Sequence, residues 1–108
     1  MIKIKEKNMM EVKVLKEATE TVVLIEGRVD TVSTPDLEKV VFPLLNEPCT
    51  LVFDCTSLEY ISSSGLRIIL SAHKMLTAKG GKFILRNLSK EVYQVFVLTG
   101  FSRILTFE

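Results

Sequence analysis

The chain begins with two stretches of β-type sequence, residues 11–16 and 21–26. Apolar and polar residues alternate along the first stretch, and the second is built around the apolar residues 22–25. The short polar link of residues 17–20 between them predicts an antiparallel hairpin. Residues 1–7 alternate as well and are expected to extend the first strand or to add an edge strand.

Gly27 and Asp30 are expected to break the pattern after the second strand, and the start of a helix follows them. Ser33 or Thr34 supplies a hydroxyl that can cap this helix, Pro35 suits its first turn, and acidic residues close behind favour the positive end of the helix dipole. Pro43 lies inside the apolar pattern and should kink or shorten the helix. The residues expected to face the core are Leu37, Val40, Val41, Leu44 and Leu45.

Residues 50–53 form a short, bulky and wholly apolar stretch, which is typical of a central strand covered on both faces. A polar passage over residues 55–60 separates this strand from Ser62-Ser63-Ser64-Gly65, where we expect a helix to begin. The helix should continue through Ala78, because apolar residues recur at helical spacing, and the glycines after it should end it. Its predicted core side comprises Gly65, Ile69, Ala72 and Leu76, flanked by Leu66, Ile68 and Met75, and Arg67, Ser71, Lys74 and Ala78 fall opposite.

The C-terminal part of the chain repeats the alternation of strand and helix. Residues 83–85 predict a strand, Ser89 is expected to cap a third helix, and Gly100 should end that helix. Residues 104–107 are expected to close the chain as a last strand. The residues of the third helix expected to face inward are Val92, Val95, Phe96 and Leu98.

The predicted order is strand, strand, helix, strand, helix, strand, helix, strand. Right-handed crossovers join strands that alternate with helices, so the later strands should be parallel. We therefore predict an α/β fold in which a mixed sheet of about five strands, with an N-terminal antiparallel hairpin, is packed by three to four helices on one face or both. At 108 residues, the chain is expected to form one domain over residues 1–108.

Composition narrows the class of function. A hydrophobic content of 47% with a net charge of +1 describes a globular chain, and the scattered Lys and Arg residues argue against a nucleic-acid partner. The first residues lack the apolar core of a signal peptide, and no apolar stretch approaches the roughly 18 residues that span a bilayer. Cys49 and Cys55 lie about 20 Å apart if extended, too far to pair. We therefore expect a cytoplasmic protein with unpaired thiols and no membrane insertion.

The three serines before Gly65 are the candidate chemistry of the chain. Extending the helical pattern backwards places Ser62 near the apolar side, Ser64 at the boundary and Ser63 on the side of Arg67, where it faces solvent. A phosphate on Ser63 would meet the unpaired amides and positive dipole of the helix start, so the fold should tolerate it. A partner docked at this position would not tolerate the added charge. If the charge costs roughly 4 kcal/mol of binding free energy, the affinity falls about a thousandfold. The alternative is a capped, hydroxyl-rich turn with no further role.

Several short sequences occur in an order and spacing that resemble a known family. They are Gly27-Arg28-Val29-Asp30, Leu51-Val52-Phe53-Asp54 with Leu58, Ile61-Ser62-Ser63-Ser64-Gly65-Leu66, Gly80-Gly81 and Leu98-Thr99-Gly100-Phe101. Together they resemble the STAS domain family, in particular the small bacterial anti-sigma factor antagonists. The resemblance covers nearly the whole chain and implies the STAS fold.

The resemblance implies a partner switch. In the family, the hydroxyl at the position of Ser63 is phosphorylated by a partner that is both anti-sigma factor and serine kinase. The unphosphorylated protein binds this kinase and releases its sigma factor, phosphorylation ends binding, and a PP2C-type phosphatase restores it. Ser62 stands where the family usually has Asp, and it can cap the helix without bringing a charge. The residues implied in partner binding are Asp30, Asp54, Ser62, Ser63, Ser64, Gly65 and Arg67.

Other interpretations are weaker or open. Asp30 and Asp54 match acids near the loop in similar proteins, but a turn or a strand end explains each of them equally well. An enzyme with Ser63 as nucleophile needs a base within reach, and His73, the only histidine, lies about 15 Å along the helix. No metal-ligand cluster, cofactor motif or pair of catalytic carboxylates is evident, so we expect no catalysis and no cofactor. The remaining alternative is a non-phosphorylated STAS interaction module of a transport or stress-signalling assembly.

Overall fold

The predicted hairpin is formed by β2 (Glu11–Lys16) and β3 (Thr21–Val29), which pair antiparallel with Val12 opposite Ile25. The computed structural model describes residues 2–3 and 10–108 of the chain. Of the alternating residues 1–7, β1 (Ile2–Lys3) pairs antiparallel with β2 as a short edge strand. The rest of that prediction lies outside the described residues.

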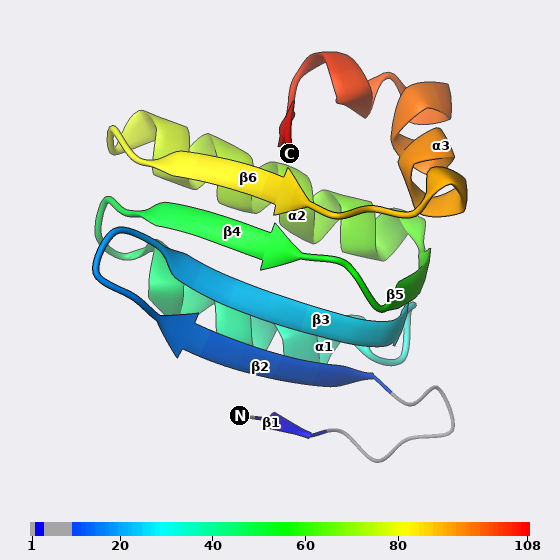
Figure 1. Cartoon of the computed structure of the whole chain (residues 1–108), viewed down its shortest axis with the longest axis horizontal. Helices are drawn as coiled ribbons and strands as arrows, with labels where there is room; N and C mark the ends of the chain where they lie inside the picture. The colour runs from blue at the N-terminus through cyan, green and yellow to red at the C-terminus, as the bar shows by residue number, and fades with distance from the viewer. Residues whose placement is uncertain (1, 4–9) are drawn as a thin grey trace.

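The central strand is β4 (Thr50–Asp54), as the apolar stretch predicts. It lies parallel between β3 and β6 (Lys82–Arg86), and β7 (Thr106–Phe107) pairs parallel with β6, so the strand order is β1-β2-β3-β4-β6-β7 (Figure 1). The mixed α/β architecture and the parallel arrangement of the later strands are thus confirmed. β7 is shorter than predicted, because residues 104 and 105 still belong to the turn that follows the third helix, where their amides bond to the backbone oxygen of Phe101.

One strand was missed by the sequence analysis. Residues 58–61, taken as part of a polar passage and its end, form β5 (Leu58–Ile61), which pairs parallel with the far end of β3. Leu58 and Ile61 are buried while the two residues between them are exposed, so the two-residue period of a strand is absent. The predicted end of the second strand at Glu26 was wrong, because β3 continues through Gly27 at positive φ, with a shift of register, as far as Val29. Of the two predicted breaks, Asp30 is the one that ends the strand.

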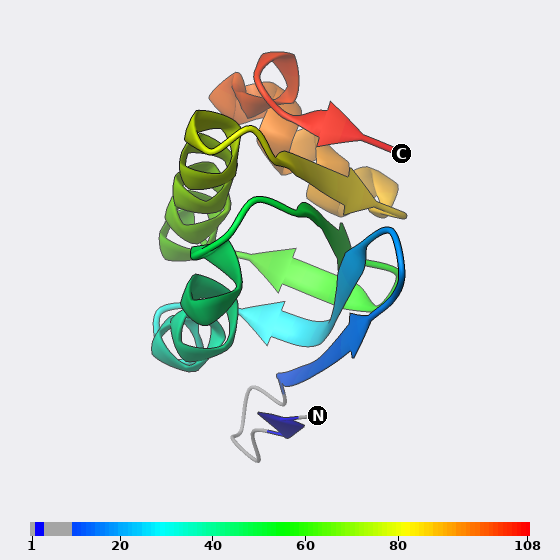
Figure 2. The same cartoon turned by 90° about the vertical axis from the view of Figure 1, so that its left-hand side faces the viewer.

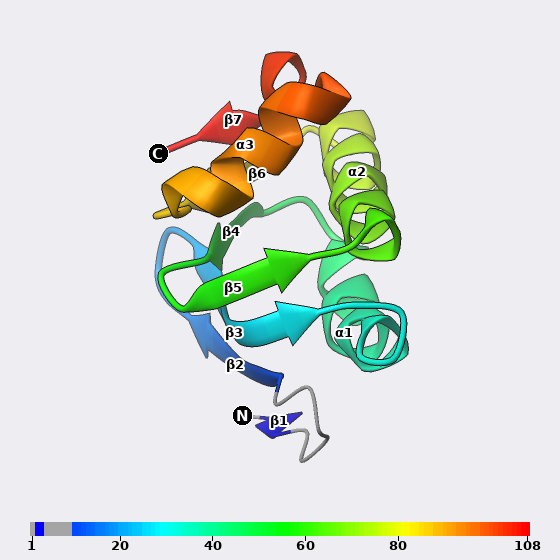
Figure 3. The same ribbon diagram turned by 90° about the vertical axis from the view of Figure 1, so that its right-hand side faces the viewer.

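Two helices pack on one face of the sheet. α1 (Thr34–Val41) and α2 (Ser63–Ala78) lie side by side, behind the strands in Figure 1 and to the left of them in Figure 2. Pro43 ends α1 as predicted, because the chain continues as the 3-10 helix η1 (Phe42–Leu45). α3 (Lys90–Thr99) contacts β5 at the end of the sheet (Figure 3).

The core is formed by the sheet with the helices α1 and α2, and Val92 and Phe96 of α3 also belong to it. Gly65, Ile69, Ala72 and Leu76 of α2 are buried as predicted, so the helix is turned as its sequence indicates. Two predicted inward residues are exposed instead: Leu98 of α3 and Met75 of α2. The largest fully buried side chains are Phe53, Phe96, Met10, Leu37, Leu45, Leu51, Ile69, Leu76, Leu85, Val12, Val23 and Val29.

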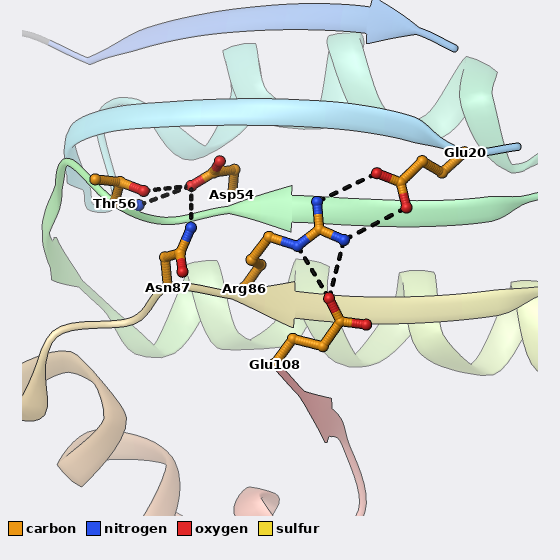
Figure 4. Close-up of polar contacts among 6 residues, drawn as sticks. All are labelled: Glu20, Asp54, Thr56, Arg86, Asn87 and Glu108. Atoms are coloured by element: carbon orange, nitrogen blue, oxygen red, sulfur yellow. Dashed lines mark hydrogen bonds and ion pairs between the residues drawn. The ribbon is translucent and has the colours of Figure 1, made fainter. Parts of the chain in front are cut away.

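The opposite face of the sheet carries neither α1 nor α2. β4 is nevertheless buried on both faces, as its apolar sequence predicts, because this helix-free face is covered as well. Val52 points to this face, since it alternates with the core residues Leu51 and Phe53, yet it is 0% exposed. The side chain of Arg86 reaches from β6 across β4 to Glu20, so part of this face is covered by a long polar side chain (Figure 4).

Candidate functional site at the start of the second helix

The start of α2 is fixed to the end of β3. The amide of Ser62 donates to the carbonyl oxygen of Val29 over 2.8 Å, and Ser62 has the extended backbone of a helix cap. Its Oγ accepts a hydrogen bond from the amide of Gly65 at 3.3 Å. The predicted helix start is confirmed, and the loop that carries the three serines is held against a buried strand.

The three serine hydroxyls occupy different environments. Ser63 is exposed, whereas Ser62 and Ser64 are half-buried, as the helical pattern predicts. The Oγ of Ser64 lies 2.8 Å from the Oγ of Ser62 and 3.0 Å from Oγ1 of Thr34. No hydrogen bond from the side chain of Ser63 to another described residue is present. Ser63 is therefore the hydroxyl of the three that is open to an external enzyme or partner.

Arg67 lies one helical turn after Ser63 and is exposed. Within residues 10–108 its guanidinium makes no hydrogen bond or ion pair, so its charge is available to an incoming anion. The unpaired amides of the first helical turn add partial positive charge at the same end of α2. The surroundings of Ser63 thus favour a negative charge.

A groove of about 270 Å³ runs between α1 and α2 beside the serine loop. Thr34 and Ser64 border it at the end near the loop, and Arg67 lines one side. Glu38 and the partly exposed ring of Phe42 line it on the α1 side. A partner that reaches Ser63 therefore finds both charged and apolar contacts next to it.

Asp30 lies in the turn between β3 and α1, next to the serine loop. Its Oδ1 accepts hydrogen bonds from the amides of Val32 at 3.0 Å and Ser33 at 3.1 Å. Its backbone oxygen accepts a hydrogen bond from the hydroxyl of Thr34, which contacts Ser64. Asp30 thus builds the turn that supports the loop, and its contact with a partner stays a prediction.

The cap of α1 differs from the prediction. Ser33 holds the cap position, but its side chain makes no capping hydrogen bond. Its buried Oγ donates to the carbonyl oxygen of Arg28 at 2.9 Å and accepts from the amide of Asp30 at 3.0 Å. Thr34 is already inside the helix. The serine–proline pattern located the helix start correctly but not the role of the hydroxyl.

Asp54 does not join the serine loop. It lies at the end of β4 on the helix-free face, where its Oδ1 accepts hydrogen bonds from Thr56 and Asn87 (Figure 4). Asp54 pairs with Leu24 on the neighbouring strand β3. Leu24 lies five residues before Val29, the residue to which the serine loop is hydrogen-bonded. Five residues of strand span about 16 Å, so Asp54 is far from Ser63. Any contact of Asp54 with a partner would belong to another part of the surface.

The electrostatics of Asp54 reflect this polar setting. Partial burial would raise the pKa of its carboxyl, but the hydrogen bonds from Thr56 and Asn87 and the charge of Arg86 outweigh burial. The pKa of Asp54 is therefore below its ordinary value of 3.8. The carboxylate is negatively charged at neutral pH.

Sequence reasoning missed a second polar cluster on the same face. Arg86 forms ion pairs with Glu20 at 3.2 Å and Glu108 at 2.9 Å, and so joins β6 to the β2–β3 turn and to the residue after β7 (Figure 4). The three residues are 22 and 66 positions apart in the chain, and no local spacing signals their contact. Only the parallel pairing of the strands brings them together.

The described residues offer little for catalysis. His73 lies ten positions after Ser63 on the same helix, about 15 Å along its axis, too far to act as a base. Burial, and then the charge of Asp54, raises the pKa of the Cys55 thiol to about 12. Both cysteines are free, as predicted. Among the described residues, no group of three or more His, Cys, Asp or Glu is placed to hold a metal ion.

Comparison with known proteins now defines the family. The model of the STAS domain matches residues 9–108. The chain belongs to the STAS domain family. The anti-sigma-B factor antagonist of Bacillus subtilis (strain 168) is 31% identical over 81 residues, which are 75% of this STAS chain and 74% of that protein.

Solved structures share the fold of this STAS domain. An anti-sigma factor antagonist from Mycobacterium paratuberculosis aligns with a TM-score of 0.84 at 22% identity, covering 96% of this chain and 89% of that one. The Bacillus cell fate determinant SpoIIAA in its phosphorylated form aligns with a TM-score of 0.69 at 19% identity, covering 92% and 90%. Of the helices in the described part of the chain, none has the length and apolar character to cross a bilayer.

Proposed function

We propose that this STAS domain is a cytoplasmic anti-sigma factor antagonist. In its unphosphorylated form it binds an anti-sigma factor that is also a serine kinase, and the bound sigma factor is released. The Bacillus subtilis relative, at 31% identity, is named an anti-sigma-B factor antagonist and supports the antagonist part of the proposal. The protein acts by binding and catalyses no reaction itself.

We further propose that phosphorylation of Ser63 ends the interaction. The observation that carries this step is the difference among the three serines. Ser63 is exposed, whereas Ser62 and Ser64 are half-buried and their hydroxyls are hydrogen-bonded to each other. A kinase needs an accessible hydroxyl, and Ser63 is the one that meets this requirement.

The mechanism follows from where the phosphate would sit. Phosphoserine carries a charge of about −1.5 to −2 at neutral pH. Beside Arg67 and the start of α2 this charge is tolerated by the domain itself. A partner surface docked over the loop would have to exclude water from the same charge, and binding would be lost. A PP2C-type phosphatase would then restore the binding form.

Phosphorylation can be tested directly. The protein is incubated with ATP and the kinase-type anti-sigma factor encoded near its gene, and the modified residue is mapped by mass spectrometry. We expect a single phosphate on Ser63, and none on the variant Ser63→Ala. Binding of the anti-sigma factor without any phosphate transfer would favour the alternative, a non-phosphorylated interaction module of a transport or stress-signalling assembly. Phosphate on Ser62 or Ser64 would contradict the assignment.

A further inference from the structure

Four hydrogen bonds connect the start of α2 to the turn before α1. The amide of Gly65 donates to Ser62 Oγ at 3.3 Å, and Ser62 Oγ lies 2.8 Å from Ser64 Oγ. Ser64 Oγ lies 3.0 Å from Thr34 Oγ1, whose hydroxyl donates to the backbone oxygen of Asp30. Ser64 and Thr34 are 30 residues apart in sequence. This chain of contacts is the only side-chain hydrogen bonding between the two turns in the described residues.

The direction of each hydrogen bond can be deduced. A carbonyl oxygen only accepts, so the single hydroxyl proton of Thr34 is used on Asp30. The proton between Thr34 and Ser64 must then come from Ser64. The proton of Ser64 is thereby used, so the one between Ser62 and Ser64 must come from Ser62. Donation runs one way, from Gly65 through Ser62, Ser64 and Thr34 to Asp30.

We propose that this hydroxyl relay, comprising Ser62, Ser64 and Thr34, couples the turn before α1 to the serine loop. Ser64 and Thr34 are positioning residues: they hold the turn that exposes Val32, 58% accessible, in a fixed place against the serine loop. Every hydroxyl in the relay has both a donor and an acceptor role filled. Ser63 is excluded from the relay and stays free.

The one-way direction makes Ser62 decisive. A cap can be provided by any side-chain oxygen, but the relay needs a residue that accepts from Gly65 and also donates to Ser64. A carboxylate at position 62 caps equally well and cannot donate. The hydroxyl of Ser64 would then donate its hydrogen bond to the carboxylate at position 62, and Thr34 would no longer receive a hydrogen bond from Ser64. The variant Ser62→Asp therefore separates the relay from the cap.

The relay can be tested without any partner. Amide hydrogen exchange is measured for Val32, Ser33 and Thr34, which bond to Asp30, in the wild type and in Ser62→Asp, Ser64→Ala and Thr34→Val. Ser62→Asp and Ser64→Ala change residues at the start of α2, not in the turn before α1. We nevertheless expect exchange at these three amides to become about tenfold faster in both variants, because each loses one hydrogen bond of the relay. Thr34→Val should likewise quicken exchange of the Gly65 amide.

Matched variants keep the test sharp. Thr34→Ser retains the hydroxyl that Thr34→Val removes, so the Gly65 amide should exchange at the wild-type rate in this variant. Ser71→Ala removes a hydroxyl that lines the groove but takes no part in the relay, and should change neither turn. If each variant changes exchange only within its own turn, or if Ser62→Asp matches the wild type, the relay is wrong. A non-additive loss of stability in the double variant Ser64→Ala/Thr34→Val would support it.

The effect on partner binding rests on the proposed function, whereas the exchange test does not. With the anti-sigma factor kinase as probe, we expect Thr34→Val to weaken binding about tenfold, although Ser63 itself is not substituted in this variant. Coupled exchange with unchanged binding would overturn the positioning role and leave the proposed function intact. Absence of any binding by the wild type would instead contradict the proposed function.

Discussion

Gly65 of α2 lies directly against Val29 at the end of β3. A Cβ atom added to Gly65 would fall 2.7 Å from Cγ1 of Val29 and 2.7 Å from Cγ1 of Ile61. Real Cβ atoms do not approach other carbons so closely, so only glycine lets the first turn of α2 reach the strands. This contact sets the depth at which α2 begins and hence the exposure of Ser63.

The close approach predicts that Gly65→Ala destabilises the domain. Alanine favours a helix over glycine by about 1 kcal/mol, but overpacking against two buried side chains costs about 1–3 kcal/mol. We expect a net loss of stability in urea denaturation, with retained fold. Thr77→Ala, on the exposed side of the same helix, is the control and should have little effect. A Gly65→Ala protein as stable as the wild type would show that the helix can shift outward freely.

A charge on the buried side of α2 should be far more damaging. Ile69 is 2% exposed and belongs to the main core, so Ile69→Asp would bury a carboxylate with no partner. We expect a loss of about 4 kcal/mol or more, enough to unfold much of a small domain. Circular dichroism and thermal melting measure it. Lys74→Asp on the opposite side is the control, and normal melting of Ile69→Asp would contradict the placement of α2.

Helix α2 and strand β5 differ in how much of their structure is encoded locally in the sequence. Helix α2 could be predicted with its buried side because its apolar residues repeat every turn, and that same period oriented Ser63. β5 could not, because its pairing with β3 depends on a register shift at Gly27 rather than on alternation. Local patterns carry information about local structure, and the pairing of distant strands is decided by the whole sheet.

The same reasoning applies to the candidate site. The exposure of Ser63 follows from its position on one helix, but the link from Ser64 to Thr34 crosses 30 residues and two turns. Asp54 was grouped with the serine loop because it matches an acid that lies near the loop in similar proteins. The structure places it on the helix-free face, opposite Leu24 of β3 and five residues away from Val29, to which the loop is anchored.

The polar setting of Asp54 predicts a dependence of stability on pH. Its pKa in the folded protein is lower than the ordinary 3.8, so the ionised form is favoured by folding. That contribution is complete above about pH 4 and is lost as the pH falls through the folded pKa. We expect Asp54→Asn to be less stable than the wild type at pH 7, with the difference shrinking below pH 4 in denaturation experiments. Glu59→Gln removes the same charge elsewhere, and a difference for Asp54→Asn that stays constant with pH would contradict the role of its hydrogen bonds.

A permanent charge at Ser63 should reproduce the proposed switch. Ser63→Glu and Ser63→Asp place a carboxylate at the positive end of α2, so the fold should survive, whereas a docked partner must bury that charge. We expect affinity for the anti-sigma factor kinase to fall about a hundredfold to a thousandfold in calorimetry, and Ser63→Ala to bind as well as the unphosphorylated wild type. Ser57→Glu adds the same charge at another exposed turn and serves as the control. Equal binding by the wild type and Ser63→Glu would mean that the partner does not cover this loop. That result would contradict the electrostatic mechanism of the proposed switch.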